Sequence, residues 1–284
     1  MSPIVAAAVV LAAVTHASWN AIAHHIKDQL VAFTLVSGGG ALIGAVLACF
    51  APLPAADAWP ALVTSAVLHV AYLTLLMRSF SLGDFGQMYP IARGTAPLVV
   101  TVAAAVFVGE SIGGWQSAGV AVASAGLVGL ALWGIRGSGR RPHWPALVAA
   151  AATGLSIAAY TVVDGVGVRA SGTPLGYIAW LMILEGLAVP LFALRRHGAR
   201  LPSLLRPYAL RGLLGAALSV LAYGLVLWAQ TRAALAPIAA LRESSIIVGA
   251  GIGTVFFKER FGTYRLVAAG VMVAGISLML LPGA

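Results

Sequence analysis

Charged side chains are scarce in this sequence. Asp, Glu, Lys and Arg make up 9% of the 284 residues, whereas soluble domains contain about 25%, and 61% of the residues are hydrophobic. Apolar runs of about 20 residues recur along the chain, and each is long enough to cross a hydrocarbon layer about 30 Å thick. These features exclude an ordinary soluble domain and predict an integral membrane protein.

The sequence contains one cysteine and lacks the common catalytic patterns. Cys49 is the only cysteine, so an intramolecular disulfide is excluded. The nucleotide-binding pattern Gly-x-x-x-x-Gly-Lys-Ser/Thr and the zinc pattern His-Glu-x-x-His are absent, and His24-His25 has no acidic partner at metal-ligand spacing. We therefore expect no enzymatic activity, no catalytic residues, no cofactor, no metal and no ATP-driven pumping.

Acidic residues are few as well. Asp and Glu number 8 against 17 Lys and Arg, which gives a formal net charge of +9. A basic soluble protein would be a candidate for nucleic-acid binding. Here the basic residues lie in short loops between apolar runs, so we expect no nucleic-acid partner. Their distribution instead indicates the orientation of the chain in a bilayer.

Polar, charged or Pro/Gly-marked breaks divide the apolar sequence into ten predicted spans. A membrane β-barrel would show alternating segments of about ten residues, so the longer runs predict an all-α fold of ten transmembrane helices. The predicted spans cover residues 4–23, 31–50, 59–80, 87–107, 113–133, 145–168, 174–194, 206–229, 235–256 and 262–281.

Two stretches that lie 149 positions apart have nearly the same pattern. Phe107-Val-Gly-Glu110-Ser-Ile-Gly113-Gly-Trp115 matches Phe256-Phe-Lys-Glu259-Arg-Phe-Gly262-Thr-Tyr264, and Arg93 matches Arg242 at the same offset. The sequence therefore predicts two repeats of five spans each, residues 1–137 and 145–284. Because five is odd, the second repeat enters the membrane from the opposite side. This predicts inverted repeats with a substrate site between them.

Lys and Arg are concentrated on one predicted side of the membrane. Loops after even-numbered spans contain only Arg169 and Arg232, whereas loops after odd-numbered spans contain eleven basic residues. The positive-inside rule then places the odd loops in the cytoplasm and both termini outside. The basic residues of the odd loops are Lys27, Arg78, Arg136, Arg140, Arg141, Arg195, Arg196, Arg200, Arg206, Lys258 and Arg260.

Together these features resemble the ten-helix EamA type of the drug/metabolite transporter superfamily. The resemblance rests on the two glutamate turns, on His16-Ala-Ser-Trp19-Asn20 and on Tyr89-Pro-Ile-Ala-Arg93-Gly-Thr-Ala-Pro97. It departs at Ala236-Pro237, which lies two residues out of register with Tyr89-Pro90. The resemblance implies secondary transport of small metabolites, often export, in a bacterial inner (plasma) membrane. It also implies a central cavity lined by spans 1, 3, 4, 6, 8 and 9.

Two arginines are predicted to lie well inside the membrane. Arg93 is six residues into span 4 and Arg242 seven residues into span 9, about 10 Å below their entry surfaces at 1.5 Å per residue. In one interpretation both guanidinium groups bind a substrate carboxylate or phosphate, which favours an anionic or zwitterionic metabolite. In the other, Arg242 is structural and bonds carbonyls freed by Pro237, or Glu243 or Glu185.

Two glutamates are candidates for proton coupling. Glu185 lies at the centre of span 7 among apolar residues, where a carboxyl group can carry a proton across the transport cycle. The alternative is a fixed counter-ion to Arg242. Glu243 points about 100° around span 9 from its neighbour Arg242, so we expect it to pair with a different helix.

Polar and aromatic side chains in the cavity-type spans are candidates for substrate binding. His16, Trp19 and Asn20 share one helix face by their spacing, and His69 shares one with Tyr72. Tyr160 and Tyr223 are the predicted counterparts of Trp19 and Tyr72 in the second repeat. Ordinary packing of a buried histidine or aromatic ring is the alternative for each.

The duplicated glutamates Glu110 and Glu259 favour a structural interpretation. Each lies at the start of a predicted helix, where a carboxylate is stabilised by the helix dipole and accepts hydrogen bonds from free amides. We therefore expect helix caps rather than functional groups. Asp164, near the end of span 6, is expected to reach the membrane interface.

The sequence thus predicts a secondary transporter of a small metabolite, for example an amino acid or an organic anion, that works by alternating access. Proton coupling and contact with the lipid bilayer belong to this prediction. Two alternatives are a membrane-embedded enzyme and a non-transporting membrane scaffold.

Overall fold

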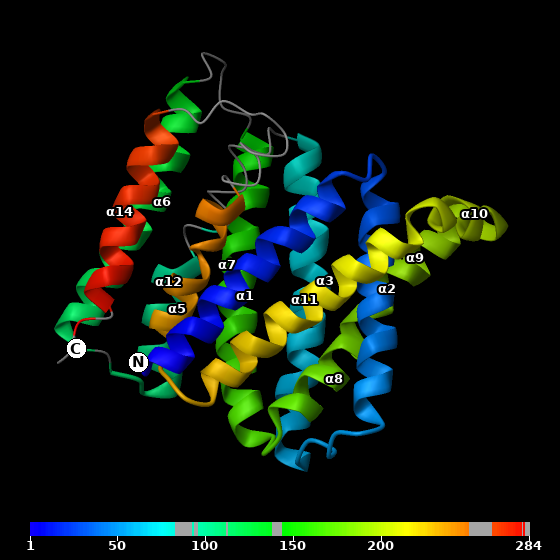
Figure 1. The fold of residues 1–284 in the computed structure, drawn as a ribbon, viewed down its shortest axis with the longest axis horizontal. Helices are drawn as coiled ribbons and strands as arrows, with labels where there is room; N and C mark the ends of the chain where they lie inside the picture. Colours follow the sequence, from blue (N-terminus) through cyan, green and yellow to red (C-terminus); the bar gives the residue numbers. More distant parts are fainter. Residues whose placement is uncertain are drawn as a thin grey trace. The chain divides into compact units, whose positions relative to one another are not determined.

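The computed structural model describes residues 1–82, 93, 96–111, 113–137, 144–249, 263–279 and 281. Every regular element in these ranges is a helix (Figure 1). The predicted all-α fold is therefore confirmed for the described part of the chain. Glu259 and Tyr89-Pro90, on which sequence predictions were made, lie outside it.

Seven long helices follow predicted spans closely. They are α1 (Pro3–His24), α2 (Gln29–Ala48), α3 (Trp59–Leu82), α6 (Gly114–Gly137), α7 (Trp144–Ala170), α11 (Ala209–Gln230) and α14 (Thr263–Met279).

Predicted spans 4, 7 and 9 contain shorter helices. Span 4 contains α5 (Ala96–Ala103), which continues as a π-helical turn, Ala104–Val108. Span 7 divides into α8 (Pro174–Gly186) and α9 (Ala188–His197), and α10 (Leu201–Leu205) follows. Span 9 contains α12 (Leu235–Arg242). Three short 3-10 turns, Ala56–Ala58, Gly198–Arg200 and Arg206–Tyr208, complete the described elements.

Side-chain caps explain two of the helix starts. The Asp28 carboxylate accepts hydrogen bonds from the amides of Leu30 and Val31 at the start of α2, at 2.9 and 3.2 Å. Thr173 accepts from the Gly176 amide at 3.0 Å and is followed by Pro174, whose ring suits the first helical position. Both caps satisfy amides that the helix itself leaves without acceptors.

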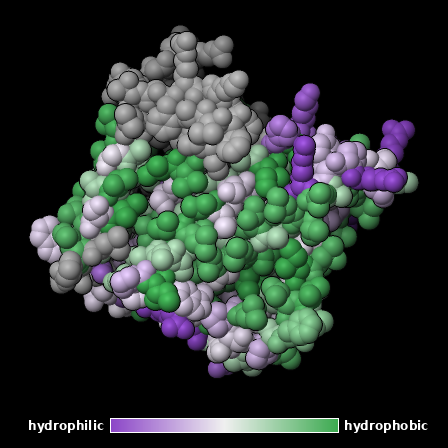
Figure 2. Space-filling model, viewed as in Figure 1, coloured by the Kyte–Doolittle hydropathy of each residue, from purple (hydrophilic) through white to green (hydrophobic). Residues whose placement is uncertain are grey.

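The described helices are suited to a bilayer. Five segments are long and apolar enough to cross it: Pro3–Ala23, Gln29–Ala48, Ala56–Arg78, Trp144–Ala170 and Pro174–Gln230. The last segment contains α8 to α11, and the shorter apolar helices Ala96–Val108 and Val267–Met279 add to the set. The surface seen in Figure 2 is largely hydrophobic, with hydrophilic side chains gathered over α9 and α10. The count of ten spans remains a prediction.

The chain forms two compact units. The first contains Met1–Val10, Ala71–Val162 and Ala233–Ala284, and the second contains Leu11–Val70 and Val163–Arg232. Each unit therefore includes segments from both predicted repeats, 1–137 and 145–284.

In the first unit, helices from equivalent positions of the two predicted repeats pack together. Helix α6 packs on α14 and α5 packs on α12. Glycines allow the α6–α14 contact, because a Cβ at Gly275 would lie 2.7 Å from the Gly119 carbonyl oxygen. A Cβ at Gly126 would lie 3.1 Å from the Ala268 carbonyl oxygen. Since the numbering rises along one helix as it falls along the other, the two helices are antiparallel.

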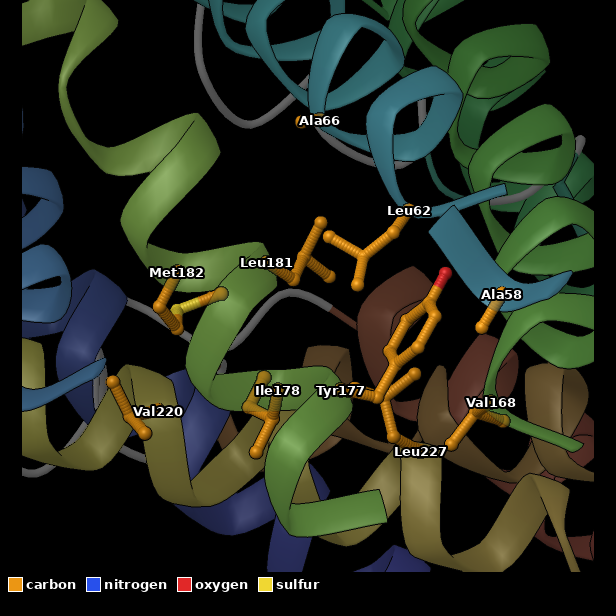
Figure 3. Packing of buried hydrophobic residues seen from close by; sticks show 10 residues of the cluster. All are labelled: Ala58, Leu62, Ala66, Val168, Tyr177, Ile178, Leu181, Met182, Val220 and Leu227. Carbon is orange, nitrogen blue, oxygen red and sulfur yellow. The ribbon is translucent and has the colours of Figure 1, made fainter. Parts of the chain in front are cut away.

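The second unit repeats this arrangement with α2 and α8, again from equivalent positions. A Cβ at Gly44 would lie 2.6 Å from the Ala179 carbonyl oxygen, and one at Gly186 would lie 2.6 Å from the Ser37 carbonyl oxygen. This pair is also antiparallel. Helices α3, α7, α8 and α11 contribute an apolar cluster in which the Tyr177 ring lies among Leu62, Leu181 and Leu227 (Figure 3).

We predict that Gly275→Ala lowers the thermal stability of the detergent-solubilised protein far more than Gly270→Ala on the same helix. The new methyl group at position 275 would meet the backbone of Ala123 at 2.5 Å, whereas position 270 has no neighbour within 4 Å among the described residues. Overpacking of this kind costs about 1–3 kcal/mol. Equal melting temperatures for the two variants would contradict the close α6–α14 contact.

Candidate functional site

Arg93 in the first unit forms a buried two-point ion pair with Glu243. Its Nε donates to Glu243 Oε2 at 2.7 Å and its Nη2 donates to Oε1 at 3.0 Å. Arg93 is 2% exposed and Glu243 1% exposed. Glu243 thus pairs with a residue of another predicted span, as its direction on span 9 suggested, and the charge of Arg93 is already balanced.

Arg242 is equally buried, at 4% exposure, but lacks such a partner. Its Nε and Nη2 have no hydrogen-bond acceptor among the described residues. Glu243 Oε1 lies 3.9 Å from Arg242 Nε and is already bound by Arg93. The Arg242 guanidinium lies 6.0 Å from the centre of the Tyr160 ring, which packs edge-on against Tyr72 at 5.6 Å. Arg242, Tyr160 and Tyr72 are therefore neighbours in the first unit.

The sequence duplication explains why the two arginines differ. The offset that matches Arg93 with Arg242 also matches Gly94 with Glu243. The counterpart of the Arg93–Glu243 pair would therefore join Arg242 to position 94, where glycine offers no carboxylate. Within the described residues, Glu243 thus hydrogen-bonds Arg93 and lies at 3.9 Å from Arg242.

The helix is irregular directly after Arg242. The amides of Glu243 and Ser244 donate to the carbonyls of Ala240 and Leu241, three residues back, and helical geometry resumes at Ser245. The hydroxyl oxygens of Ser244 and Ser245 have no partner within the described ranges. Breaks of this kind in membrane helices occur where backbone and side chains contact a ligand.

Glu110 caps a helix, although not the one that follows it. Its Oε2 accepts a hydrogen bond from the amide of Leu235, the first residue of α12, at 2.8 Å. Gly109, at φ 71°, ends the preceding turn, and from there the Glu110 carboxylate reaches the first residue of α12. The residue still stabilises a helix N-terminus, as its chemistry favours.

The second unit contains a separate group of buried polar residues. Asp164 is 0% exposed, so the expectation that it reaches the membrane interface is wrong. Its Oδ1 accepts a hydrogen bond from the Tyr177 hydroxyl at 2.9 Å, and its Oδ2 accepts one from the Tyr223 hydroxyl. The His69 ring packs edge-on against Tyr223 at 5.2 Å.

Glu185 belongs to the same group. Its Oε2 lies 3.5 Å from His69 Nδ1 and has no hydrogen-bond donor among the described residues. His69 Nδ1 also lies 3.0 Å from the Ser65 carbonyl oxygen. Among the described residues of the second unit, His69 is thus the basic residue in contact with Glu185.

Comparison with known proteins finds a family match in the second half of the chain. Residues 144–281 match the EamA-like transporter family. This EamA-like domain covers nearly all of the predicted repeat 145–284 and agrees with the resemblance found in the sequence. The match and the apolar helices support an integral membrane protein, and the matched family is one of transporters.

A solved structure supports the fold along nearly the whole chain. The structure, titled "Crystal structure of protein", has a TM-score of 0.69 and 16% sequence identity, and the alignment covers 98% of this chain and 95% of that chain. At this identity the likeness shows the fold alone. No curated protein matches the sequence.

Most of the polar residues described above lie in the EamA-like domain. The predicted substrate-binding face of span 1, formed by His16, Trp19 and Asn20, lies outside it. On α1, Trp19 Nε1 donates to His16 Nδ1 at 3.3 Å, and Asn20 Nδ2 donates to the His16 carbonyl oxygen at 2.9 Å. The three residues therefore contact one another as their spacing predicted. Their role in substrate binding remains a prediction.

Sequence reasoning missed Tyr177, Ser65 and the burial of Asp164. Asp164 in an otherwise apolar run was the available signal, and a carboxylate there needs donors from elsewhere. Tyr177 lies across a loop on the next helix of the EamA-like domain, so nothing in the spacing connected it with Asp164.

We predict that Arg93→Met and Arg242→Met differ in their effect on thermal unfolding in detergent. Arg93→Met leaves Glu243 buried without its counter-ion, which should cost about 3–5 kcal/mol. Arg242→Met removes a guanidinium whose Nε and Nη2 have no hydrogen-bond acceptor among the described residues and whose Nε lies 3.9 Å from Glu243 Oε1, so its cost should be smaller. Both variants replace arginine by methionine at positions that match across the predicted repeats. Equal losses of stability would contradict the difference in pairing between Arg93 and Arg242.

Proposed function

We propose that this protein is a secondary transporter that moves a small anionic or zwitterionic metabolite across the membrane by alternating access, without ATP. The observation that carries the proposal is the buried guanidinium of Arg242. Two of its N–H groups have no acceptor among the described residues.

The neighbouring ion pair indicates what Arg242 would bind. Arg93 holds the Glu243 carboxylate through its Nε and Nη2 edge. Arg242 has the same two nitrogens available. Buried donors without partners cost about 1–3 kcal/mol each, more when charged, so a ligand that supplies a carboxylate would be favoured strongly. By the repeat offset, Gly94 is the counterpart of Glu243 but has no carboxylate. A substrate would supply the carboxylate that Gly94 lacks.

The surroundings of Arg242 favour a ligand with a further flat or apolar part. Tyr160 and Tyr72 provide aromatic surface, and Ser244 and Ser245 provide hydroxyl groups that have no partner in the described part of the chain. Carboxylate recognition with aromatic contact suits amino acids and organic acids. We include His16, Trp19 and Asn20 in the proposed substrate path, as their span assignment implies.

The pairing of equivalent helices supports alternating access by inverted repeats. The repeat offset of 149 maps Gly126 onto Gly275 and Gly119 onto Ala268. Shifting each residue by the repeat offset therefore turns the contact Gly126–Ala268 into the contact Gly275–Gly119. A two-fold axis that relates the repeats requires this equivalence. Because α6 and α14 are antiparallel, that axis is perpendicular to them and would lie in the membrane plane.

The proposal assigns different roles to the two glutamates predicted for proton coupling. Glu243 is engaged at both oxygens by Arg93, so we propose a structural role for it. Glu185 retains the coupling role. A bacterial inner membrane, with both termini outside, completes the proposal on the basis of the loop charges.

We predict that Arg242→Gln lowers the affinity for transported carboxylates about 10–100-fold, because it removes charged hydrogen bonds worth about 1.5–3 kcal/mol. The test measures binding and flux of radiolabelled amino acids, organic acids and organic amines with protein reconstituted in liposomes. Arg232→Gln, which removes an exposed guanidinium, is the matched control and should leave affinity unchanged.

The outcomes of this experiment separate the possible functions. Unchanged carboxylate affinity in Arg242→Gln would refute the proposal that Arg242 binds the substrate carboxylate. It would not contradict the proposal that the protein is a transporter. A preference for amines over carboxylates would overturn the proposed substrate class. A folded wild-type protein that neither binds nor moves any solute in the panel would favour a non-transporting scaffold.

A further inference from the structure

The second unit contains an ionisable cluster that is separate from the Arg242 site. It consists of Ser65 and His69 on α3, Asp164 on α7, Tyr177 and Glu185 on α8, and Tyr223 on α11. Helix α2, which also packs on α8 and α11, has no ionisable side chain between Gln29 and Ala48. Among the described residues, the cluster contains two carboxyl groups, one imidazole and two phenols.

Asp164 is the best-satisfied member of the cluster. Each of its two oxygens accepts a hydrogen bond from a tyrosine hydroxyl, and the Ser65 hydroxyl lies close to the same carboxylate. An ionised carboxylate accepts on both oxygens, whereas a protonated one would have to direct its own hydrogen at one of these partners. The geometry of Asp164 therefore suits the ionised form.

His69 contacts Ser65 one helical turn before it on α3. Its Nδ1 lies 3.0 Å from the Ser65 carbonyl oxygen and 3.1 Å from the Ser65 hydroxyl oxygen, so it can donate to the carbonyl or accept from the hydroxyl. In its charged form the imidazolium balances one carboxylate of the cluster.

Glu185 is the member without adequate donors. Its Oε2 is 3.5 Å from the His69 nitrogen that already bonds the Ser65 carbonyl, and no residue in the described ranges donates to it. With His69 in its charged form and Asp164 ionised, the two charges cancel and the cluster is neutral when Glu185 holds a proton. Tyr177, which donates to Asp164, lies in the apolar cluster with Leu62 and Leu181 (Figure 3).

We propose that this cluster is the proton-binding site of the protein, in which Glu185 takes up and releases one proton while Asp164, held by Tyr177 and Tyr223, stays ionised. His69, whose Nδ1 lies 3.5 Å from Glu185 Oε2, is the basic residue next to Glu185 in the cluster. The coupling role of the site rests on the proposed transport function, but its protonation does not. Asp164 and the two tyrosines are positioning residues, because they set the charge against which Glu185 titrates.

Infrared spectroscopy of the purified full-length protein tests the protonation directly, because a protonated carboxyl group has its own carbonyl stretching band. We expect a band in the wild type that disappears as the pH is raised and that Glu185→Gln removes. Asp164→Asn should weaken it near neutral pH, since Glu185 then becomes the only counter-ion of His69. Asp57→Asn, at an exposed carboxylate, is the control and should not change it.

A second pair of variants keeps the proposal testable if Asp164→Asn does not fold. Tyr177→Phe and Tyr223→Phe retain the packed rings and each remove one donor from Asp164. Their combination should make Asp164 take up a proton and add a second carboxyl band. A band that persists in Glu185→Gln, or a wild type without a protonated carboxyl group at any pH where it is folded, would overturn the proposal.

Transport under an imposed pH gradient tests the coupling role. In liposomes, Glu185→Gln should lose gradient-driven accumulation of the labelled carboxylates but retain their exchange down a concentration gradient. Gradient-driven accumulation that survives in Glu185→Gln would refute coupling at this site. A wild type that moves no solute would refute the transport function, and the infrared result would still decide the protonation.

Discussion

A charge buried among apolar helices needs a counter-charge, and in the first unit this requirement is met by the ion pair of Arg93 and Glu243. Both residues are almost completely buried, and two charge-assisted hydrogen bonds join a residue of predicted span 4 to one of span 9. Removing either partner would leave a bare charge, which is far more costly than the pair itself. The pair therefore fixes the register of these segments and engages the glutamate that lies next to Arg242 in the described part of the chain.

The proposed function depends first on Arg242, which does not take part in this two-point ion pair. Arg242 is held in a buried position beside Tyr160, while the carboxylate that would neutralise it is already bound by Arg93. In the second unit the imbalance has the opposite sign, because two carboxyl groups share one imidazole. A surplus of buried positive charge suits an anion, and a surplus of carboxyl groups suits a proton. In this proposal the first unit binds an anion and the second unit binds a proton.

Close packing of small residues provides the framework for both units. Glycines at the α6–α14 and α2–α8 crossings bring backbones so near that an added methyl group would collide with a carbonyl oxygen. Such contacts do not depend on the hydrophobic effect, which is weak between helices surrounded by lipid. They also pair segments that the duplication makes equivalent, so the sequence repeat has a counterpart in the contacts.

The sequence alone predicted the all-α fold, most helix boundaries of the described part and the family resemblance that the second half of the chain matches. These properties depend on local features, namely runs of apolar residues, capping residues at their ends and a repeat at constant offset. The choice of partners could not be derived in this way. Glu110 lies beside one helix but caps another, and Tyr177 meets Asp164 only because α7 and α8 fold against each other. Composition and periodicity determine which segments form apolar helices, whereas three-dimensional packing decides which polar groups on them are buried and which buried charges are paired.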